Sequence, residues 1–491
     1  MLFRSVLPVA VLDQDSGTDV AVQYQMWQDK LLRALSDGSV ADSHQRRAVR
    51  EMKQHQEVVD ELVESSSDEE ADAEPMLDLE DLGGALQQAN KKSRDEDIIV
   101  TSRDELKLLQ KEMVTPSLAK SLTKQGYKLI GSHSGVKLCR WTKAMLRGRG
   151  GCYKHSFYGI TSYQCMEMTP SLACANKCIF CWRHHKNPVG KGWRWKVDAP
   201  EFLYEQAIAL HRAMIRECRG VPGVSAERLL EADMPRHCAL SLVGEPIIYP
   251  YINEFIDLLH KNHISSFMVT NAQFPDKIDE LKPVTQLYIS VDAATKESLK
   301  AVDRPLFDDF WERFLSSIDS LSKKGQRTVF RLTLIKEWNM AEVHNYASLI
   351  ARGKPDFVEI KGVTYCGTSK ASPLKITNTP FHEEVVKFTQ QICDEANKML
   401  GEDNFYELAC EHEHSTCMLM ANSKKFKVNG EWHTWIDYDK FHALVDNDAT
   451  FSSEDYRAPT PSWAVFGSKE HGFDPEETRF QRKKKPPTQG C

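Results

Sequence analysis

The sequence lacks any long hydrophobic run. Its longest apolar stretches have the length of a β-strand, far short of the roughly 18 to 20 residues that a membrane-spanning helix requires. The N-terminus, MLFRSVLPVAVLDQD, holds one arginine and a short apolar run that Pro8 interrupts, which favours a buried strand over a secretory signal. No repeat of the solenoid type is present. We therefore expect a cytoplasmic protein without a membrane span.

Glycine and proline are too sparse for a collagen-like or wholly disordered chain. They account for 25 and 21 of the 491 residues, whereas 41% of the residues are hydrophobic. At about 150 residues per domain, this length allows roughly three units with at least one large core. The chain also holds 13 cysteines, and thiols stay reduced where no secretory signal is present. Clustered cysteines then indicate metal binding or catalysis rather than disulfides.

Negative charge is concentrated in one region. The net charge of the chain is −7, but residues 51–110 alone contain 18 acidic and 6 basic residues, which leaves about +5 for the rest. A mildly basic body suits a nucleic-acid partner. The acidic region includes SSSDEEADAE, whose low hydrophobicity is typical of a solvated linker. We therefore expect an ordered helix over 20–36, followed by a disordered linker over 37–112.

Beyond this linker, strand-like runs alternate with amphipathic helical patterns. Repeated β-then-α units with continuously apolar strands predict an α/β fold with a parallel sheet, as a partial or full (β/α) barrel with its site at the carboxyl ends of the strands. A strand-like stretch over 406–421 and a hairpin turning at Asn429-Gly430 form a small C-terminal extension. The expected strands cover 237–244, 265–272, 285–293, 327–335 and 356–363, and the expected helices cover 251–262, 307–325, 341–353 and 381–400.

The sharpest motif is CANKCIFCWRHH, which places Cys174, Cys178 and Cys181 at C-x3-C-x2-C spacing. Thiolates hold iron–sulfur clusters, and three of them leave one iron of a [4Fe–4S] cube open for catalysis. The alternative is a structural zinc knuckle with His184 or His185 as the fourth ligand. The spacing and the aromatic residue before the third cysteine resemble the radical S-adenosylmethionine (SAM) superfamily, and the run of β/α units that follows favours iron.

Polar residues end several of the expected strands. A GEP sequence follows the first of them and resembles the superfamily motif that receives the amino group of the SAM methionine. The next strands end in Val-Thr-Asn and Ser-Val-Asp, where a ribose or carboxylate would lie. The candidate SAM contacts are Gly244, Glu245, Pro246, Thr270, Asn271, Ser290, Asp292 and, with Thr333 on the same strand face, Arg331.

Three further cysteines precede the first group. Cys139, Cys152 and Cys165 are spaced C-x12-C-x12-C and suggest a second cluster with one open iron; buried free thiols are the alternative. Lys154 follows Cys152 by two residues, on the same face if this segment is a strand. An amine at this position could form a Schiff base with a carbonyl substrate.

Seven motifs in order over about residues 115–491 resemble the tRNA 4-demethylwyosine synthases, radical SAM enzymes of wybutosine biosynthesis. They are GSHSGVKLCRWTKAMLRGRGGCYKH, TPSLACANKCIFCWRHHKNPVG, ALSLVGEPI, VTNAQFP, YISVDA, IKGVTYCG and ACEHEHS. The resemblance implies a carbon–carbon lyase that condenses 1-methylguanosine beside the anticodon of tRNA-Phe with pyruvate to give 4-demethylwyosine.

By the same resemblance, two sets of ligands and one catalytic residue are implied. Cys174, Cys178 and Cys181 would hold the [4Fe–4S] cluster that cleaves SAM, and the three upstream cysteines, 139, 152 and 165, would hold an auxiliary [4Fe–4S] cluster. Lys154, in the CYKH motif, would form the Schiff base with pyruvate.

Eukaryotic members of this family usually carry a flavodoxin-like FMN domain that supplies electrons. Here only about 36 residues precede the acidic linker, so we expect an external electron donor and a fragment or short isoform. The expected organisation is a flavodoxin-like remnant (1–36), the linker (37–112), a radical SAM core (113–377), a wyosine-base-formation region (378–445) and a mobile basic tail (446–491).

Basic residues are interleaved with aromatic ones at 139–151, 182–186 and 191–196, a pattern that suits phosphate contacts and base stacking. Cys410, His412 and His414 alternate along one expected strand, with Cys417 nearby; a zinc site is one interpretation, and a substrate-contacting or structural role is favoured. Two other functions stay open. One is an inactive, zinc- or cluster-stabilised RNA-binding protein, and the other is a radical SAM activase.

Overall fold

The computed structural model describes residues 111–478, apart from 182–186, 368–371 and 402–404. The expected flavodoxin-like remnant (1–36) and nearly all of the acidic linker lie outside these residues, as do His184, His185 and the final segment 479–491.

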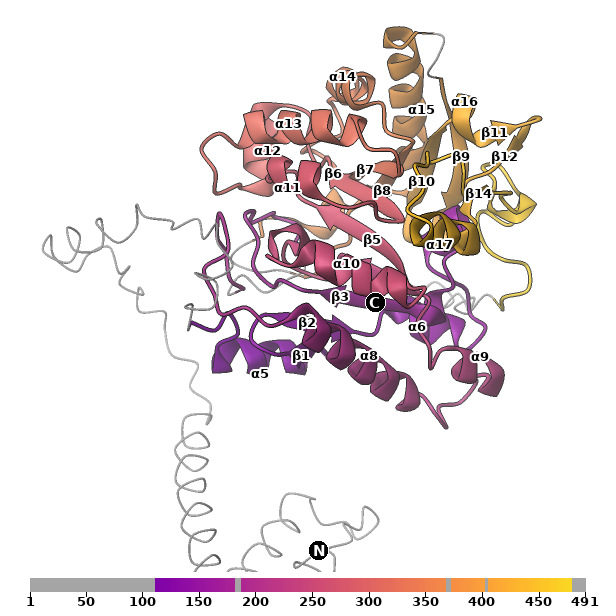
Figure 1. Cartoon of the computed structure of the whole chain (residues 1–491). Helices are drawn as coiled ribbons and strands as arrows, with labels where there is room; N and C mark the ends of the chain where they lie inside the picture. Colours follow the sequence, from indigo (N-terminus) through magenta and orange to yellow (C-terminus); the bar gives the residue numbers. More distant parts are fainter. Residues whose placement is uncertain (1–110, 182–186, 368–371, 402–404, 479–491) are drawn as a thin grey trace, which may run out of the picture. The chain divides into compact units, whose positions relative to one another are not determined.

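A ten-stranded sheet forms the centre of the described structure (Figure 1). Strands β3 to β8 are parallel and follow one another in chain order across the sheet, while β1 and β2 on one side and β10 and β9 on the other add antiparallel pairs. The strands are β1 (Lys128–Ile130), β2 (Ser134–Lys137), β3 (Cys165–Thr169), β4 (His237–Leu240), β5 (Ser265–Thr270), β6 (Gln286–Ser290), β7 (Arg327–Leu334), β8 (Phe357–Gly362), β9 (Tyr406–His412) and β10 (Cys417–Asn422).

Long helices cover one face of this sheet. Their apolar sides and the sheet residues that face them form the largest core, which is why β4 to β8 are almost continuously apolar. Helices on one face of a sequentially ordered parallel sheet give a partial (β/α) barrel, as expected. These helices are α8 (Pro200–Arg216), α10 (Ile252–Lys261), α11 (Pro275–Glu280), α12 (Lys296–Asp303), α13 (Phe310–Ser322), α14 (Val343–Gly353) and α15 (His382–Met399).

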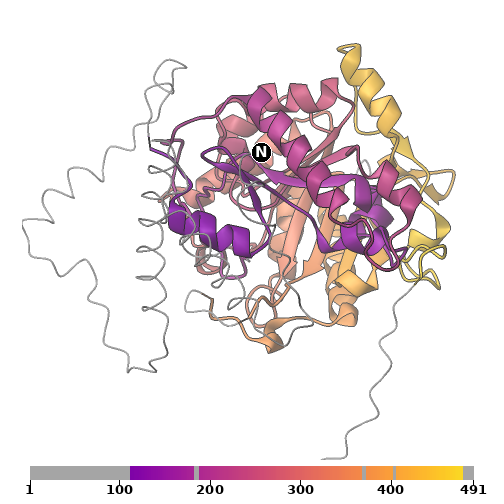
Figure 2. The same ribbon diagram turned by 90° about the horizontal axis from the view of Figure 1, so that it is seen from below.

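The opposite, inner face of the sheet is covered by short elements from two distant parts of the chain. Early segments lie beside late ones there, indigo beside yellow in Figure 2. A second core joins Phe157 of α7 to Tyr288 and Phe357 of the sheet and to Trp432 and Tyr456 near the C-terminus. The smaller elements of the structure, of which α5 packs on the main core and α9 buries no residue, are α5 (Pro116–Lys124), α6 (Arg140–Met145), α7 (Tyr153–Tyr158), α9 (Ala226–Glu231), α16 (Ser423–Phe426), β11 (Lys427–Val428), β12 (Glu431–Trp432), β13 (Trp435–Ile436), α17 (Tyr438–Asp446) and β14 (Arg457–Ala458).

The five strands and four helices expected of the barrel are confirmed as β4–β8 and as α10, α13, α14 and α15. The hairpin is confirmed as well, because β11 pairs with β12 around Asn429 and Gly430, whose φ angles are 51° and 87°. Two residues with positive φ suit the tight turn that asparagine–glycine sequences favour.

Three expectations were wrong. Lys154 lies in helix α7, not in a strand, and the chain becomes extended again only at Cys165. The stretch 406–421 is two strands, because a short 3₁₀ turn and Thr416 at a φ of 51° reverse the chain between β9 and β10. Residues 446–478 are not a mobile tail: they include buried Tyr456 and Ala464 and pack on the inner core.

Candidate active site

The loop of the first cysteine group leaves the carboxyl end of β3. Cys174 is 8% exposed, and the amide groups of Lys177 and Ile179 donate to the carbonyl oxygens of Asp303 and Val302 at 2.9 Å. The loop is therefore fixed against the last turn of α12, at the edge of the sheet where a (β/α) barrel holds its site. Burial raises the pKa of the Cys178 thiol well above its usual value, with nearby Asp303 adding to the effect.

The GEP and VTN motifs meet this loop. Gly244 has a φ of 73°, and a Cβ there would lie 2.0 Å from the carbonyl oxygen of Ser171, so only glycine fits. Glu245 is 2% exposed, and its Oε2 accepts a hydrogen bond from the Asn271 amide at 2.8 Å. The Asn271 side chain in turn donates to the Cys174 sulfur at 3.4 Å. Two separate motifs and the cysteine loop thus form one continuous group.

The other oxygen of Glu245, Oε1, makes no well-formed hydrogen bond among the described residues. Burial raises the pKa of this carboxyl group to about 7, against hydrogen bonds that lower it. A buried acceptor without a donor costs free energy unless a ligand supplies one. The Thr270 side chain and the Ile247 amide lie beside this carboxyl group without a well-formed hydrogen bond to Oε1, so the oxygen can accept a further one.

Asp292 and Arg331 lie on the next strands but contact other groups. The Oδ1 of Asp292 accepts from the Thr333 amide at 3.1 Å, and burial raises its pKa to about 6. Ser290 pairs in register with Arg331, whose Nε lies 3.9 Å from Oε1 of Glu359. Asp292 therefore joins the ends of β6 and β7, and Arg331 faces the interior of the barrel.

The second cysteine group comes from three different elements. Cys139 caps the N-terminus of α6, Cys152 caps that of α7, and Cys165 begins β3. The thiols of Cys152 and Cys165 are among the groups that raise the pKa of Cys139, so the three lie in one electrostatic neighbourhood, although among the described residues no three such side chains are close enough to hold a single metal ion. Burial raises the pKa of Cys152 to about 11 and that of Cys165 to about 12, with Lys154 opposing the shift in both. All three thiols are free.

Lys154 lies on the inner face of the sheet, beside the second group. Its Nζ is 5.3 Å from the centre of the Tyr288 ring, in a cation–π arrangement. In helix α7 the lysine follows the capping residue Cys152 by two positions, and the amine stays within electrostatic range of the thiols of Cys152 and Cys165. The expected neighbourhood of lysine and cysteines is present, although a helix rather than a strand produces it.

The end of α7 is held by residues about 280 positions later in the chain. The orphan carbonyl groups of the last helical turn accept three side-chain hydrogen bonds, which satisfies what a helix terminus otherwise leaves unpaired. These bonds run from Thr434 Oγ1 to Phe157, from Trp435 Nε1 to Ser156 and from Tyr438 Oη to Tyr158, at 2.8, 3.0 and 2.9 Å. Nothing in the local sequence around Lys154 indicates that these three distant side chains support the helix.

The loop before Cys152 is held by Glu477. Its Oε2 accepts from the Gly150 amide at 3.1 Å, and its Oε1 pairs with Arg228 at 2.6 Å. Gly472 accepts a 2.5 Å hydrogen bond from the hydroxyl of Ser156. We name residues 432–478 the C-terminal segment; it supports the helix and the loop that carry Cys152 and Lys154.

Two inner-face residues were missed by sequence reasoning, Glu359 and Lys361. The period-two alternation in DFVEIKGV contained the signal, since it places both charged residues of β8 on the face opposite the covering helices. Tyr158 donates to Glu359 at 3.2 Å, and Cys417 pairs in register with Lys361.

The contacts of the C-terminal histidines fit the favoured structural role, and the zinc interpretation finds no support among the described residues. Among the described residues, no group of three His, Cys, Asp or Glu side chains could hold a metal ion. The His412 Nδ1 instead accepts from the Ser415 amide at 3.2 Å, and the Cys410 thiol lies 3.5 Å from the Thr434 hydroxyl. The rings of His412 and His414 pack edge-on against Trp141, with centroids 5.7 and 5.4 Å away.

In the stretches that interleave basic and aromatic residues, the aromatic and the basic side chains differ in exposure. Trp193 and Trp195 are 7% and 4% exposed and belong to the main core, so the expectation that they stack on bases is wrong. The charged residues beside them are exposed: Arg140 and Arg149 near the second cysteine group, and Arg194 farther along. Trp182 of the expected stretch 182–186 lies outside the described residues.

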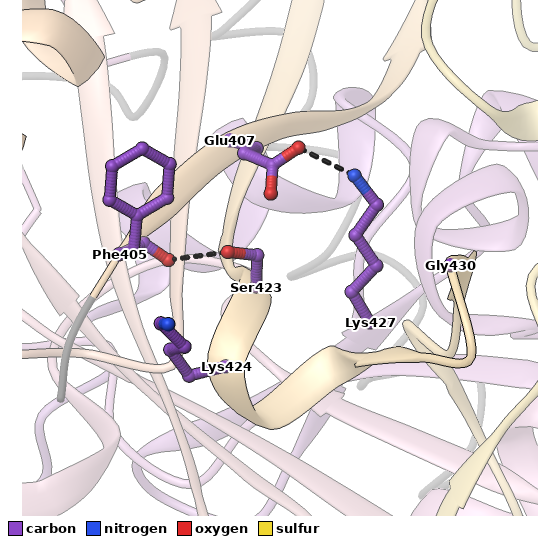
Figure 3. Close-up of a pocket in the computed structure, with 6 residues that line it drawn as sticks. All are labelled: Phe405, Glu407, Ser423, Lys424, Lys427 and Gly430. Atoms are coloured by element: carbon purple, nitrogen blue, oxygen red, sulfur yellow. Dashed lines mark hydrogen bonds and ion pairs between the residues drawn. The ribbon is translucent and has the colours of Figure 1, made fainter. Parts of the chain in front are cut away.

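One surface hollow of about 400 Å³ lies away from these groups (Figure 3). It is formed by the first residues of β9, by α16 and by the β11–β12 hairpin, so it opens at the end of β9 opposite His412. Lys427 donates to Glu407 at 2.6 Å, and Ser423 donates to the carbonyl of Phe405 at 3.0 Å. These polar groups of the hollow therefore already have hydrogen-bond partners within the protein. No helix of the described residues is both long and apolar enough to cross a membrane.

Comparison with known proteins shows two matched regions. Residues 168–350 match the radical SAM superfamily, and residues 352–422 match the family described as wyosine base formation. The C-terminal segment and the second cysteine group lie outside both matched ranges.

Relatives in rice, thale cress and a frog are named S-adenosyl-L-methionine-dependent tRNA 4-demethylwyosine synthase. The Oryza sativa protein is 54% identical over 98% of this chain, and that of Arabidopsis thaliana is 55% identical over 98%; the chain spans 72% of each. The Xenopus laevis protein is 60% identical over 84% of this chain, which spans 56% of it.

Two solved structures are similar as well. One is titled "Structure of TYW1 with a lysine-pyruvate adduct bound" (33% identity, TM-score 0.56), and the other is an archaeal TYW1 (31%, 0.52). Each is matched over 65% of this chain and 99% of its own length. The relatives are more than half identical to this chain, and the radical SAM and wyosine-base-formation families both match it. The chain therefore belongs to the family of SAM-dependent tRNA 4-demethylwyosine synthases.

Proposed function

We propose that this chain is a radical SAM lyase that modifies tRNA-Phe, condensing 1-methylguanosine beside the anticodon with pyruvate to form 4-demethylwyosine. Family membership supports the reaction class. The observation that carries the proposal is that Lys154 lies against Tyr288 of the inner face, within electrostatic range of Cys152 and Cys165, in a barrel whose carboxyl edge holds the Cys174 loop.

The first cysteine group suits a [4Fe–4S] cluster. Its three cysteines lie on one loop, which backbone hydrogen bonds anchor to the end of α12. A cluster held by Cys174, Cys178 and Cys181 would supply the electron that cleaves SAM. The proposal includes a flavodoxin-like, FMN-containing protein or a reductase as the donor of that electron.

The orphaned Oε1 of Glu245 suits the ammonium group of SAM. A carboxylate and an ammonium form a charge-assisted hydrogen bond, which is stronger than a neutral one. Asn271 holds Glu245 through its backbone amide and reaches Cys174 with its side chain, so it would keep the amino-acid end of SAM beside the first group. Gly244 lets the chain pass Ser171 closely enough for this arrangement.

The second cysteine group suits an auxiliary [4Fe–4S] cluster. Three half-buried thiols from three elements lie in one electrostatic neighbourhood, and positive charge is needed to deprotonate them, since burial raises the pKa values of all three. Bound iron would supply that charge, since Lys154 must be a neutral amine to act as a nucleophile.

Lys154 would act as the nucleophile toward pyruvate. Its amine would add to the carbonyl carbon and water would leave, giving an imine that retains the carboxylate. The related structure with a lysine–pyruvate adduct supports this role. Exposed Arg140 and Arg149, close to Cys139 and Cys152 in the chain, would contact the phosphates of the anticodon stem–loop.

The test begins with anaerobic reconstitution of the full chain and analysis of iron, sulfide and zinc. Two clusters predict about eight irons per chain, and about four in a Cys152→Ala variant. The reconstituted protein, supplied with a reductant, SAM, pyruvate and a tRNA-Phe carrying 1-methylguanosine, should form 4-demethylwyosine, detected by mass spectrometry of digested nucleosides.

Other outcomes separate the alternatives. Zinc without iron after reconstitution would favour the RNA-binding protein and contradict the enzyme. Cleavage of SAM without a change in the tRNA, whatever the carbonyl donor, would favour an activase. Four irons in the unmodified chain would remove the auxiliary cluster but keep the radical enzyme.

A further inference from the structure

Four aromatic side chains from three distant parts of the chain meet at one place. The ring centroid of Trp141 in α6 lies 5.4 Å from that of His414 and 5.7 Å from that of His412, both edge-on. Phe473 of the C-terminal segment lies 4.8 Å from His412 and 5.8 Å from His414. We name Trp141, His412, His414 and Phe473 the aromatic cluster. It forms only when α6, the turn after β9 and the C-terminal segment pack together.

The members of the aromatic cluster differ in exposure. Trp141 is 9% exposed and His412 is 1% exposed, so these two rings form its base. His414 is exposed, although its ring contacts those of Trp141 and Phe473. An exposed side chain that its neighbours already hold in place loses little conformational entropy when it binds a ligand. His414 is therefore a preorganised aromatic surface.

The aromatic cluster lies between the second cysteine group and the carboxyl edge of the sheet. The Trp141 amide donates to the Cys139 sulfur at 3.5 Å, so one side of the cluster adjoins a thiol of that group. The turn that carries His414 is joined to the end of β8, because the Gly362 amide donates to the Thr416 carbonyl oxygen at 2.9 Å. A (β/α) barrel holds its site at this edge. His414 therefore lies at the rim of the candidate active site.

Exposed arginines lie on both sides of the aromatic cluster. The guanidinium carbon of Arg140 lies 5.0 Å from the centre of the Trp141 ring, in a cation–π arrangement. On the other side, the loop of Arg149 contacts Phe473, since a Cβ at Gly150 would lie 3.4 Å from the phenyl ring. Positive charge thus flanks the rings.

Three acidic residues adjoin the aromatic cluster in the chain, and each lies beside a histidine. The pairs are Glu411 with His382 at 3.1 Å, Glu413 with His471 at 3.6 Å and Asp474 with His155 at 3.7 Å. These carboxylates face imidazole rings of the protein, whereas the two arginines are exposed. Exposed cations around an aromatic surface suit single-stranded nucleic acid, because the cations contact phosphates while a ring stacks on a base.

We propose that His414 stacks on an unpaired nucleobase of the RNA substrate, beside the base that reacts, with Arg140 on the adjoining phosphate. This inference rests on the proposed function. A base must leave its stack to reach a buried reaction centre, so the nucleotides next to it stay at the rim. Unstacked bases of RNA loops are recognised by aromatic rings, including those of histidines. The contact fixes the position of the loop, since every base has a face on which a ring can stack.

The experiment measures how the full, anaerobically reconstituted chain binds an anticodon stem–loop RNA that carries 1-methylguanosine. Fluorescence anisotropy of the labelled RNA gives the dissociation constant at several salt concentrations. The variants are His414→Ala, His414→Phe, Arg140→Gln and, as the control, His344→Ala, which removes an exposed histidine of α14 in the outer helix layer. A second set of RNAs lacks the base of one unpaired nucleotide at a time.

His414→Ala should weaken RNA binding about tenfold and leave the salt dependence of the affinity unchanged, because stacking releases no counterion. His414→Phe should keep most of the affinity. Arg140→Gln should lower the slope of log affinity against log salt by about one. The loss in His414→Ala should vanish with one of the abasic RNAs, because the base that the ring contacts is then absent. His344→Ala should bind like the unsubstituted chain.

Three results would overturn the inference. A loss of the same size with every abasic RNA would show that His414 does not stack on a base. Equal losses in His414→Ala and His414→Phe would show that the histidine acts through the fold and not through a flat ring. Unchanged binding by His414→Ala would show that the RNA lies elsewhere.

Failure of the proposed function has a different result. If the unsubstituted chain binds the stem–loop no better than a DNA hairpin of the same length, an RNA substrate is refuted and the role of His414 falls with it. If the unsubstituted chain prefers the RNA and all His414 variants bind it equally well, the proposed function stands and the stacking surface alone is refuted.

Discussion

The two cysteine groups differ in how the chain builds them. Cys174, Cys178 and Cys181 lie on one loop, fixed at the end of a single β/α unit by backbone hydrogen bonds to α12. The other group takes one cysteine from each of α6, α7 and β3, and its support comes from the C-terminal segment (432–478). A site on one loop depends on local geometry, whereas a site on three elements depends on whatever holds those elements together.

The largest effect should come from removing one thiol from each group. Cys178→Ala should abolish formation of 5′-deoxyadenosine from SAM, whereas Cys152→Ala should retain it and lose the tRNA product. Chromatography of both products measures the difference, with Cys218→Ala, a buried thiol outside both groups, as the control. A Cys152→Ala variant that loses SAM cleavage as completely as Cys178→Ala would show that the groups are not independent.

The support from the C-terminal segment is tested by Gly472→Ala. At a φ of 82° a Cβ would meet the carbonyl oxygen of Glu411 at 1.9 Å, so the segment must shift. We expect a loss of about 2–4 kcal/mol of stability and a fall in reconstituted iron, with SAM cleavage retained.

Gly467→Ala is the matched control for this substitution. Its φ is 79°, but nothing lies within 4 Å of the added Cβ, so only the backbone strain of about 1 kcal/mol applies. Thermal unfolding and iron analysis compare the two variants. Equal losses of iron would show that strain alone, rather than displacement of the segment, explains the effect.

A smaller effect is expected from Glu477→Gln. The change removes the charge that pairs with Arg228 at 2.6 Å while keeping an acceptor for the Gly150 amide. Because the Glu477 side chain is buried and Arg228 is partly exposed, the cost should be about 1–3 kcal/mol. Denaturant unfolding measures it, and Glu454→Gln, which breaks an exposed pair with Arg457, should cost under about 0.5 kcal/mol. Equal costs would contradict the claim that Glu477 is a specific anchor.

The affinity for SAM beside the first cysteine group should depend on pH, because Glu245 titrates there. Burial raises the pKa of its carboxyl group to about 7, so the group is protonated and neutral below that pH and anionic above it. An ammonium ligand favours the anion, and the affinity for SAM should therefore rise about tenfold between pH 5.5 and 7.5. Calorimetric titration measures this rise. Glu245→Gln should bind more weakly at pH 7.5 and show a flat profile; a slope that persists in this variant would assign the titration to another group.

The smallest effect is expected at the hollow of Figure 3, far from both groups. Lys424 lies there on the surface, and Lys424→Ala should change stability by no more than about 0.5 kcal/mol and leave the tRNA product unchanged. A clear loss of tRNA modification in this variant would place part of the RNA-binding surface at this end of the sheet.

Local patterns predicted the parts of the molecule that depend on neighbours in sequence. The alternation of apolar strands and amphipathic helices predicted β4–β8 and the helices between them, and the C-x3-C-x2-C spacing located the first loop. The hairpin at Asn429-Gly430 followed from the backbone preference of two residues. The roles of the cysteines and of Lys154 stay predictions until metal analysis and trapping are done.

Helix α7 shows where such patterns fail. Six residues, YKHSFY, are too few for a stable isolated helix, so periodicity could not distinguish it from a strand. The helix exists because Thr434, Trp435 and Tyr438 satisfy its terminal carbonyl groups from far along the chain. The same limit explains why residues 446–478 gave no sign of order, since the core on which they pack is formed by other elements.

The sequence by itself determined the barrel, its carboxyl edge and the loop of Cys174, because hydrophobic periodicity and close ligand spacing act over a few residues. Only the tertiary structure decided that Cys139, Cys152 and Cys165 share one electrostatic neighbourhood, that Lys154 lies in a helix within range of two of them and that Lys361 projects from the inner face of the sheet. Strand register and contacts between distant segments place these groups, and neither is encoded in the spacing of neighbouring residues.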